Sequence, residues 1–351
     1  MRSYRPRCSP WFVLGRTLFI GQRRVRPGAV GRRPGPGVRR WEGWAGVPAC
    51  GCILVVATFL ALVIPPSAQG QLPGDPEVTT SIRSLGLGGA LPLADRDPDL
   101  LFGNPALVER ARGSGVALVR PAPGDRRVSM AAATGWWGGG AALGVRVLDG
   151  LGNHPSQGMG GEAGPGGVGR TTLGTVTAGY ARTVMGVHAG ASVTGVEARR
   201  GDERDAVATV DLGVAVDLGV VTLGVSGGGL GPSLEFVPSE PEGMERLNAR
   251  WVRAAFGTPS TALGPLDVAA AGSFTVREGY RPRAGIGVEV GWWPVAGRTF
   301  VGRAGLESGR PADSSPWSAG GAFLGDSFTL EYALRPRVDG GWVHGVGVRF
   351  R

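Results

Sequence analysis

The sequence predicts an all-β protein: an antiparallel transmembrane β-barrel of about 14 strands, with an N-terminal plug segment that contains a short helix. Glycine accounts for 64 of the 351 residues, about 18%, against a usual value near 7%. From residue 114 onward, apolar and polar residues alternate with the period-two pattern of strands. The alternating segments are about ten residues long and even in number, as a single-chain transmembrane barrel requires.

Residues 1–70 are expected to form an arginine-rich leader and signal peptide. Residues 1–50 hold eleven arginines and one acidic residue, a net charge of +10, so residues 51–351 carry −1 of the total of +9. An apolar run, Ala49–Ile64, follows a pair of arginines and precedes small residues, which is the pattern of a secretory signal peptide. Cleavage is expected after Ala68 or Gly70. A single transmembrane anchor is the alternative, but sixteen apolar residues fall short of the ~20 that a spanning helix needs.

Composition excludes several classes of function for the rest of the chain. All 37 basic residues are arginine, which removes a P-loop lysine and a Schiff-base lysine. The near-neutral body lacks the basic stripe of a nucleic-acid-binding surface, so no nucleic-acid partner is expected. Cys8, Cys50 and Cys52 all precede the body, which therefore has neither a disulfide framework nor a thiolate metal site.

The sequence contains no recognisable catalytic, cofactor or metal site, so we predict that the protein is not an enzyme. Its three histidines, His154, His188 and His344, stand in no motif that pairs them with a nucleophile. The D-x-D-x-D run that begins at Asp95 opens like a calcium-binding loop, but the glycine and the final glutamate of such a loop are missing.

The barrel itself is assigned to residues 114–351. In one segment, Ile286, Val288 and Trp292 alternate with Glu289 and with glycines, which suits a lipid-facing side and a lumen-facing side. A soluble secreted β-sandwich, with the apolar side buried in a core, is the alternative. The predicted strands span residues 114–121, 127–137, 139–148, 171–182, 184–197, 206–216, 220–229, 246–256, 266–276, 283–293, 298–307, 316–324, 327–335 and 342–350.

The connections between these strands alternate in length. Those after odd-numbered strands are longer and carry most of the loop charge, for example the predicted loop 198–205, whereas the others are mostly tight, such as a turn around Arg182–Thr183. This asymmetry is typical of long outside loops and short periplasmic turns.

The last strand ends with an outward aromatic residue, Phe350, before Arg351. Most of the body's tryptophans lie near strand ends, where an interfacial belt is expected: Trp136, Trp137, Trp251, Trp292, Trp293, Trp317 and Trp342.

The segment before the barrel, residues 71–113, is predicted to be a plug. It contains the glycine-rich run Leu85–Ala90, an acidic turn with Asp95 and Asp97, and the motif Asn104-Pro105-Ala106. About thirty residues of this segment resemble the opening of FadL-like and PorV-like (PorV/PorQ) outer-membrane proteins. The resemblance implies a fourteen-stranded barrel with the N-terminal segment inside.

The motif residues of this plug are its candidate functional residues. Proline at a first helical position after Asn104 predicts a short helix over 106–112. Asp95, Asp97 and Asp99 are expected to pair, near water, with lumen arginines such as Arg146, Arg283 or Arg303.

Two functions follow from the resemblance. The first is a plugged channel for hydrophobic small molecules, as in FadL-like proteins. The second is a non-transporting component of a protein secretion apparatus, as in PorV-like proteins. Either implies a bacterial outer-membrane location after removal of the signal peptide. The expected partners are outer-membrane lipid and either hydrophobic small molecules or a secretion-system protein.

Overall fold

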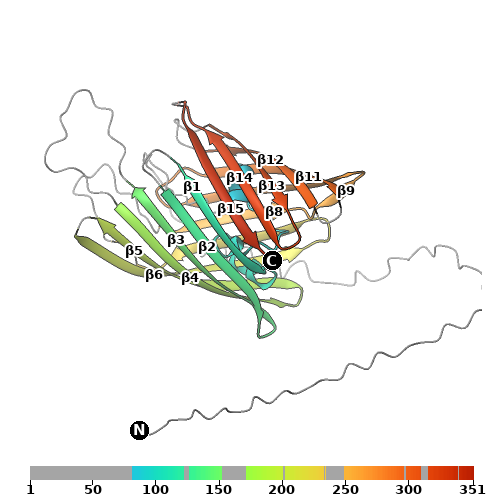
Figure 1. Ribbon diagram of the computed structural model, residues 1–351. Coiled ribbons are helices and arrows are strands. Elements are labelled where there is room, and N and C mark those ends of the chain that lie inside the picture. Colours follow the sequence, from blue (N-terminus) through green and yellow to red (C-terminus); the bar gives the residue numbers. More distant parts are fainter. Residues whose placement is uncertain are drawn as a thin grey trace, which may run out of the picture. The chain divides into compact units, whose positions relative to one another are not determined.

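The structure is a computed structural model that describes residues 81–121, 126–151, 171–200, 202–232, 234, 249–295, 298–309, 315–338 and 340–351 (Figure 1). The chain divides into two units, Met1–Ala49 and Cys50–Arg351, and all described residues belong to the second. The leader, its cleavage sites at Ala68 and Gly70, and His154 lie outside the described residues.

The described strands form a closed antiparallel barrel. Fourteen of them pair in chain order, and the first strand pairs with the last. The strands are β1 Gly113–Arg120, β2 Arg126–Trp136, β3 Gly139–Leu151, β4 Thr171–Val184, β5 Val187–Arg200, β6 Glu203–Asp217, β7 Thr222–Leu230, β8 Trp251–Gly257, β10 Leu266–Arg277, β11 Arg283–Val295, β12 Arg298–Ser308, β13 Trp317–Leu324, β14 Phe328–Pro336 and β15 Trp342–Phe350. An additional short strand, β9 Thr261–Leu263, pairs with β10 only. The predicted fourteen-stranded barrel is therefore confirmed.

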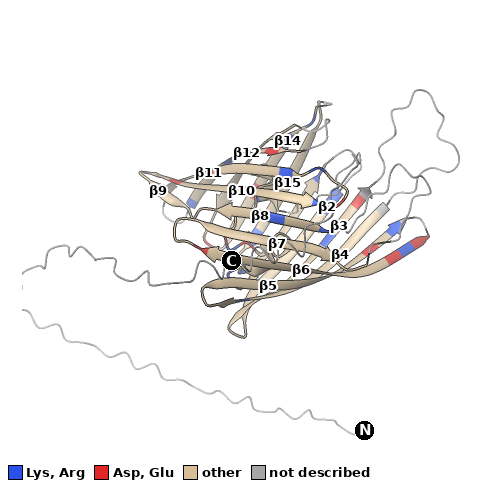
Figure 2. Cartoon of the chain, turned by 180° about the vertical axis from the view of Figure 1, so that it is seen from behind, with Lys and Arg blue, Asp and Glu red and all other residues tan. Residues whose placement is uncertain are grey.

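The outer face of the barrel is apolar and exposed. On β11, Ile286 and Trp292 point outward and are 54% and 51% exposed, while Glu289 points inward and is 7% exposed. Outward valines, leucines and phenylalanines continue this pattern on the other strands, and charged residues are sparse along the strands in Figure 2. A protein surface with this much exposed apolar area is unfavourable in water but is suited to the hydrocarbon layer of a membrane. Among the described residues, no helix is long and apolar enough to cross a membrane.

The two ends of the barrel differ, and we call them the turn side and the loop side. On the turn side, β2–β3 and β4–β5 are joined by two-residue turns. Both residues of each turn, Trp137-Gly138 and Met185-Gly186, have positive φ, the geometry of a tight hairpin. The turn predicted around Arg182–Thr183 therefore lies at Met185-Gly186 instead.

Two loop-side predictions are wrong. The expected loop 198–205 is part of a long hairpin, because β5 and β6 stay paired up to Arg200 and Glu203. Glu197 there binds Arg204 at 2.7 Å, so charges that suggested a loop are neutralised on the surface of extended strands. Trp251 is not in the outer belt; it lies in register with inward-facing Gly228 and lines the lumen.

Residues 81–112, which we call the lumen segment, precede β1. They form α2 Ile82–Gly86 and two 3-10 helices, η1 Pro98–Phe102 and η2 Pro105–Glu109. Each helix begins after a capping side chain, from Ser81, Asp97 and Asn104 respectively. The helix expected at 106–112 is thus a shorter 3-10 helix that begins at Pro105.

Candidate functional site: the lumen segment and its cavities

The lumen segment packs against inward-facing residues on opposite parts of the barrel wall. Its α2 contacts β12–β15, whereas η2 contacts β2–β6. Wall hydroxyls bind its backbone directly. Ser318 Oγ accepts a hydrogen bond from the Gly88 amide at 2.8 Å, and Ser226 Oγ donates one to the Gly103 carbonyl at 2.8 Å.

The motif Asn104-Pro105-Ala106 is buried against wall glycines. The side-chain oxygen of Asn104 accepts from the Ala106 amide at 3.0 Å, and its amide group donates to the Val214 carbonyl at 3.3 Å. A Cβ at Gly213 on β6 would overlap the Asn104 side chain, and one at Gly190 on β5 would overlap the Pro105 carbonyl. The motif can approach the wall this closely only because these two positions lack side chains.

The glycine-rich run makes a second backbone contact, on β11 and β12. A Cβ at Gly305 would overlap the backbone at Leu87 and Gly88, and a Cβ at Gly287 would crowd Leu87. Gly88 itself has φ +66 and lies against the backbone of Leu306, so it also has no room for a side chain. Glycine is therefore needed on both sides of this contact.

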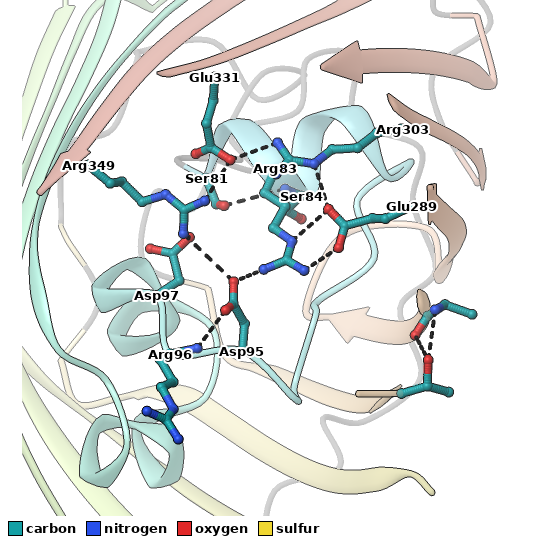
Figure 3. Close-up of polar contacts among 12 residues, drawn as sticks. Ser81, Arg83, Ser84, Asp95, Arg96, Asp97, Glu289, Arg303, Glu331 and Arg349 are labelled. Atoms are coloured by element: carbon teal, nitrogen blue, oxygen red, sulfur yellow. Dashed lines mark hydrogen bonds and ion pairs between the residues drawn. The ribbon is translucent and has the colours of Figure 1, made fainter. Parts of the chain in front are cut away.

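A network of buried charges joins the lumen segment to the wall (Figure 3). Arg83 on α2 forms ion pairs with Asp95 of the same segment and with Glu289 on β11. Glu289 also accepts a hydrogen bond from Arg303 on β12 at 2.6 Å. Arg83 thus extends a row of wall charges into the segment.

The same network continues to the last strand. Arg303 contacts Glu331 on β14 at 2.7 Å, and Glu331 accepts a hydrogen bond from Arg349 on β15 at 2.8 Å. Arg349 donates in turn to Asp97 at 2.7 Å and lies 3.7 Å from Asp95. Opposite charges alternate throughout, which offsets the cost of removing them from water.

The predicted partners of the acidic turn are wrong in detail. Asp95 and Asp97 pair with arginines as expected, but these are Arg83 and Arg349. Arg303 is occupied by wall carboxylates, and Arg283 pairs with Glu307 on β12 at 3.5 Å. Asp97 is also buried rather than near water.

Sequence reasoning missed the wall side of the network, Glu289, Glu331 and Arg349. The sequence feature that points to them is an acidic or basic residue among small residues on the lumen-facing side of a strand. That pattern alone does not reveal which strands bring their charges together.

Because Glu331 bridges two arginines, its loss is expected to be costly. The Glu331→Gln variant should lose about 3–5 kcal/mol of unfolding free energy, since Arg303 and Arg349 would keep buried charges with one partner fewer. Heat or denaturant unfolding in detergent measures this. The matched control is Glu197→Gln, at the surface pair with Arg204, which should leave the unfolding midpoint unchanged. Equal midpoints for the two variants would contradict a stabilising network.

On the turn side, η2 is held by a polar cluster around His188. The ring nitrogens of His188 lie 3.0 Å from Glu109 and 3.0 Å from Asp217, and Arg110 also reaches Asp217 at 3.1 Å. Burial raises the pKa of Glu109, but hydrogen bonds from His188 and Thr183 outweigh it and hold the pKa below its usual value. The cluster ties the end of the lumen segment to β4, β5 and β6 as a charged contact.

Two cavities lie against opposite sides of residues 83–92 of the lumen segment. The loop-side cavity, of about 130 Å³, has Ser84, Gly89 and Leu91 in its lining. The turn-side cavity, of about 140 Å³, has Arg83, Leu87 and Pro92 in its lining. Different residues of one short stretch therefore line the two cavities.

Within the described ranges, no cluster of three or more histidine, cysteine, aspartate or glutamate residues has an arrangement that could hold a metal ion. His188 belongs to the polar cluster, and His344 points outward and lies 2.8 Å from the Tyr332 hydroxyl. Neither ring lines the two cavities.

No protein-family model matches this chain, and no curated protein matches it. Several solved structures share the architecture at low identity. The CymD monoaromatic hydrocarbon channel is 12% identical, with 78% of this chain and 97% of that chain covered, at a TM-score of 0.48. A Pseudomonas aeruginosa FadL homologue is 10% identical over 80% and 99% of the two chains, at 0.46. The P. putida toluene transporter TodX is 12% identical over 80% and 98%, at 0.45. The PorV-like part of the resemblance stays a prediction.

Proposed function

We propose that the protein is an outer-membrane channel for hydrophobic small molecules, in which the lumen segment acts as the plug. One observation carries the proposal: residues 83–92 line both a loop-side cavity and a turn-side cavity inside a barrel with an exposed apolar outer face. A solute that enters from the loop side meets this stretch before it reaches the turn side. The motif residues Asp95, Asp97, Asn104, Pro105 and Ala106 then serve to hold the plug in place.

The loop-side cavity supports a route for molecules with an apolar part. Leu148, Leu173 and Val196 form an inward-facing apolar patch near the loop ends of β3, β4 and β5. Phe102 of the lumen segment and Trp251 of β8 add aromatic surface. Two solved structures of similar architecture are described as a monoaromatic hydrocarbon channel and a toluene transporter, which agrees with this class of solute.

A second candidate is a non-transporting component of a secretion apparatus, in which the lumen segment is a permanent filling. The close contacts at Gly190, Gly213 and Gly305 favour it, because the segment lies directly against the wall at these positions. A permanent filling and a movable plug differ in permeation.

Permeation into vesicles tests the proposed function. Purified full-length protein in liposomes should accelerate entry of benzyl alcohol over protein-free liposomes. The control is an equal amount of an unrelated closed barrel. Equal entry rates with and without the protein would reject transport and favour the secretion component.

The location is tested by fractionation. We expect the mature protein in the detergent-extracted outer membrane, where it should run as a heat-modifiable band, because the closed barrel resists detergent until it is heated. The total-membrane and periplasmic fractions serve as controls. Recovery in the soluble periplasmic fraction would contradict the outer-membrane location.

A further inference from the structure

The loop-side cavity is lined by more basic than acidic side chains. Arginines enter it from three strands, β3, β8 and β10, whereas one acid comes from the lumen segment and one from β6. These residues are Arg146, Arg253, Arg277, Asp99 and Asp211. The other polar lining residues are two serines and five threonines: Ser81, Ser84, Thr175, Thr177, Thr194, Thr209 and Thr275.

Arg146 has no carboxylate within ion-pair distance among the described residues. Its Nε donates to Thr175 Oγ1 at 3.1 Å, and its guanidinium lies 4.6 Å from the centre of the Phe102 ring. These contacts fix the guanidinium plane and leave its outer nitrogens for another acceptor. A guanidinium matches a carboxylate with two parallel hydrogen bonds.

Two acids, Asp211 and Asp99, attract Arg146 electrostatically, but neither forms an ion pair with it among the described residues. Asp211 accepts a hydrogen bond from the Gly229 amide at 2.9 Å and lies 3.4 Å from the hydroxyls of Ser192 and Thr194. Burial, and then the nearby Asp97, raise the pKa of Asp99 well above its usual value. With three arginines and two aspartates in its lining, the cavity has more positive than negative side chains.

A neutral hydrocarbon would fill this cavity poorly. It would cover the Arg146 guanidinium without replacing the hydrogen bonds that water makes to it, which is unfavourable. The cavity is close in size to an engineered cavity of about 150 Å³ that holds one benzene molecule. A compact molecule with one ring, one charged group and an apolar side would match this lining and this volume.

We propose that the loop-side cavity binds single-ring carboxylates, with the carboxylate on Arg146 and the ring against Leu148, Leu173 and Trp251. This inference rests on the proposed channel function and assigns that channel a charged class of solute. Arg146 acts as the specificity-determining residue, because Thr175 and Phe102 fix its guanidinium and it has no carboxylate within ion-pair distance among the described residues.

Fluorine NMR of the full-length protein in detergent tests the proposal. The probe is 4-fluorobenzoate, and the neutral comparison is 4-fluorobenzyl alcohol. Wild-type protein should bind the benzoate saturably, and Arg146→Gln should weaken that binding by about tenfold or more, as expected for loss of a charge-assisted hydrogen-bonded pair. Binding of the alcohol should change little in the same variant. Arg146→Lys, which restores the charge without the planar fork, should recover part of the affinity.

The matched control is Arg204→Gln, which removes an arginine from the surface of the β5–β6 hairpin and should bind 4-fluorobenzoate like wild type. Heat-modifiability of each variant verifies that it is folded. Absence of saturable benzoate binding by wild type, or equal affinity of Arg146→Gln and wild type, overturns the proposal. If the alcohol enters vesicles while benzoate fails to bind, the channel function stands and the carboxylate assignment alone fails.

Discussion

Removal of residues 85–110 is expected to raise the conductance of the barrel several-fold in planar bilayers. A fourteen-stranded barrel is wider than the eight-stranded barrels whose side chains already fill the interior, so the lumen opens once the segment is gone. Single-channel recordings of full-length and deleted protein at equal salt measure the effect. Conductance at the full-length level from an assembled deletion variant would refute the plug.

A milder variant provides the control for gross damage. Asn104→Ala keeps the chain length but removes a cap and a hydrogen bond to the β6 backbone, a loss of about 0.5–2 kcal/mol at the cap. We expect it to assemble and to show brief openings whose conductance lies between that of the full-length protein and that of the deletion variant. If the deletion variant does not assemble at all, the segment is structural first, and the secretion component gains over the channel.

The second large effect is expected when one branched side chain is placed on the inner wall of the barrel. Gly305→Val should lower the unfolding midpoint markedly, because its Cβ would overlap the backbone at Leu87 and Gly88. Overpacking typically costs about 1–3 kcal/mol, and backbone relieves overlap less readily than a side chain does. The variant is compared with wild type by loss of the heat-modifiable band on a temperature series.

The same strand offers a matched control. Gly302 points outward, and a Cβ there meets nothing within 4 Å, so Gly302→Val should melt like wild type. In the protein that lacks residues 85–110, Gly305→Val should become harmless as well, since the overlapping backbone is gone. A persistent defect there would mean that β12 itself, and not the contact with Leu87, rejects the side chain.

The strands could be predicted because the alternation of residues within each strand reflects the lipid on one face and the lumen on the other. Outward positions of β11 meet lipid and inward positions meet the lumen, so alternation within one segment is sufficient evidence. The run of charges at 198–205 suggests a loop in the sequence, but it lies on paired strands, where Glu197 and Arg204 neutralise each other. Trp251 was assigned to the outer belt because its position near a strand end does not show which face it occupies.

The partners within the lumen could not be predicted for a different reason. Arg349 and Asp97 are 252 residues apart in the sequence, and their contact depends on the register of every strand between them. The acidic turn was recognisable from its local motif. The arginine that would reach it was not, because several inward-facing arginines satisfied the same local pattern.

The position of the lumen segment also bears on how the barrel closes. It is covalently joined to β1, yet its α2 lies against β12–β15, and Arg349 on β15 reaches back to Asp97. Bringing the first and last strands together costs chain entropy that grows with the length of the loop between them. A segment attached to one of these strands and bound to the other holds them near each other before their hydrogen bonds form. The same residues that fill the finished barrel would then help β1 and β15 to pair during assembly.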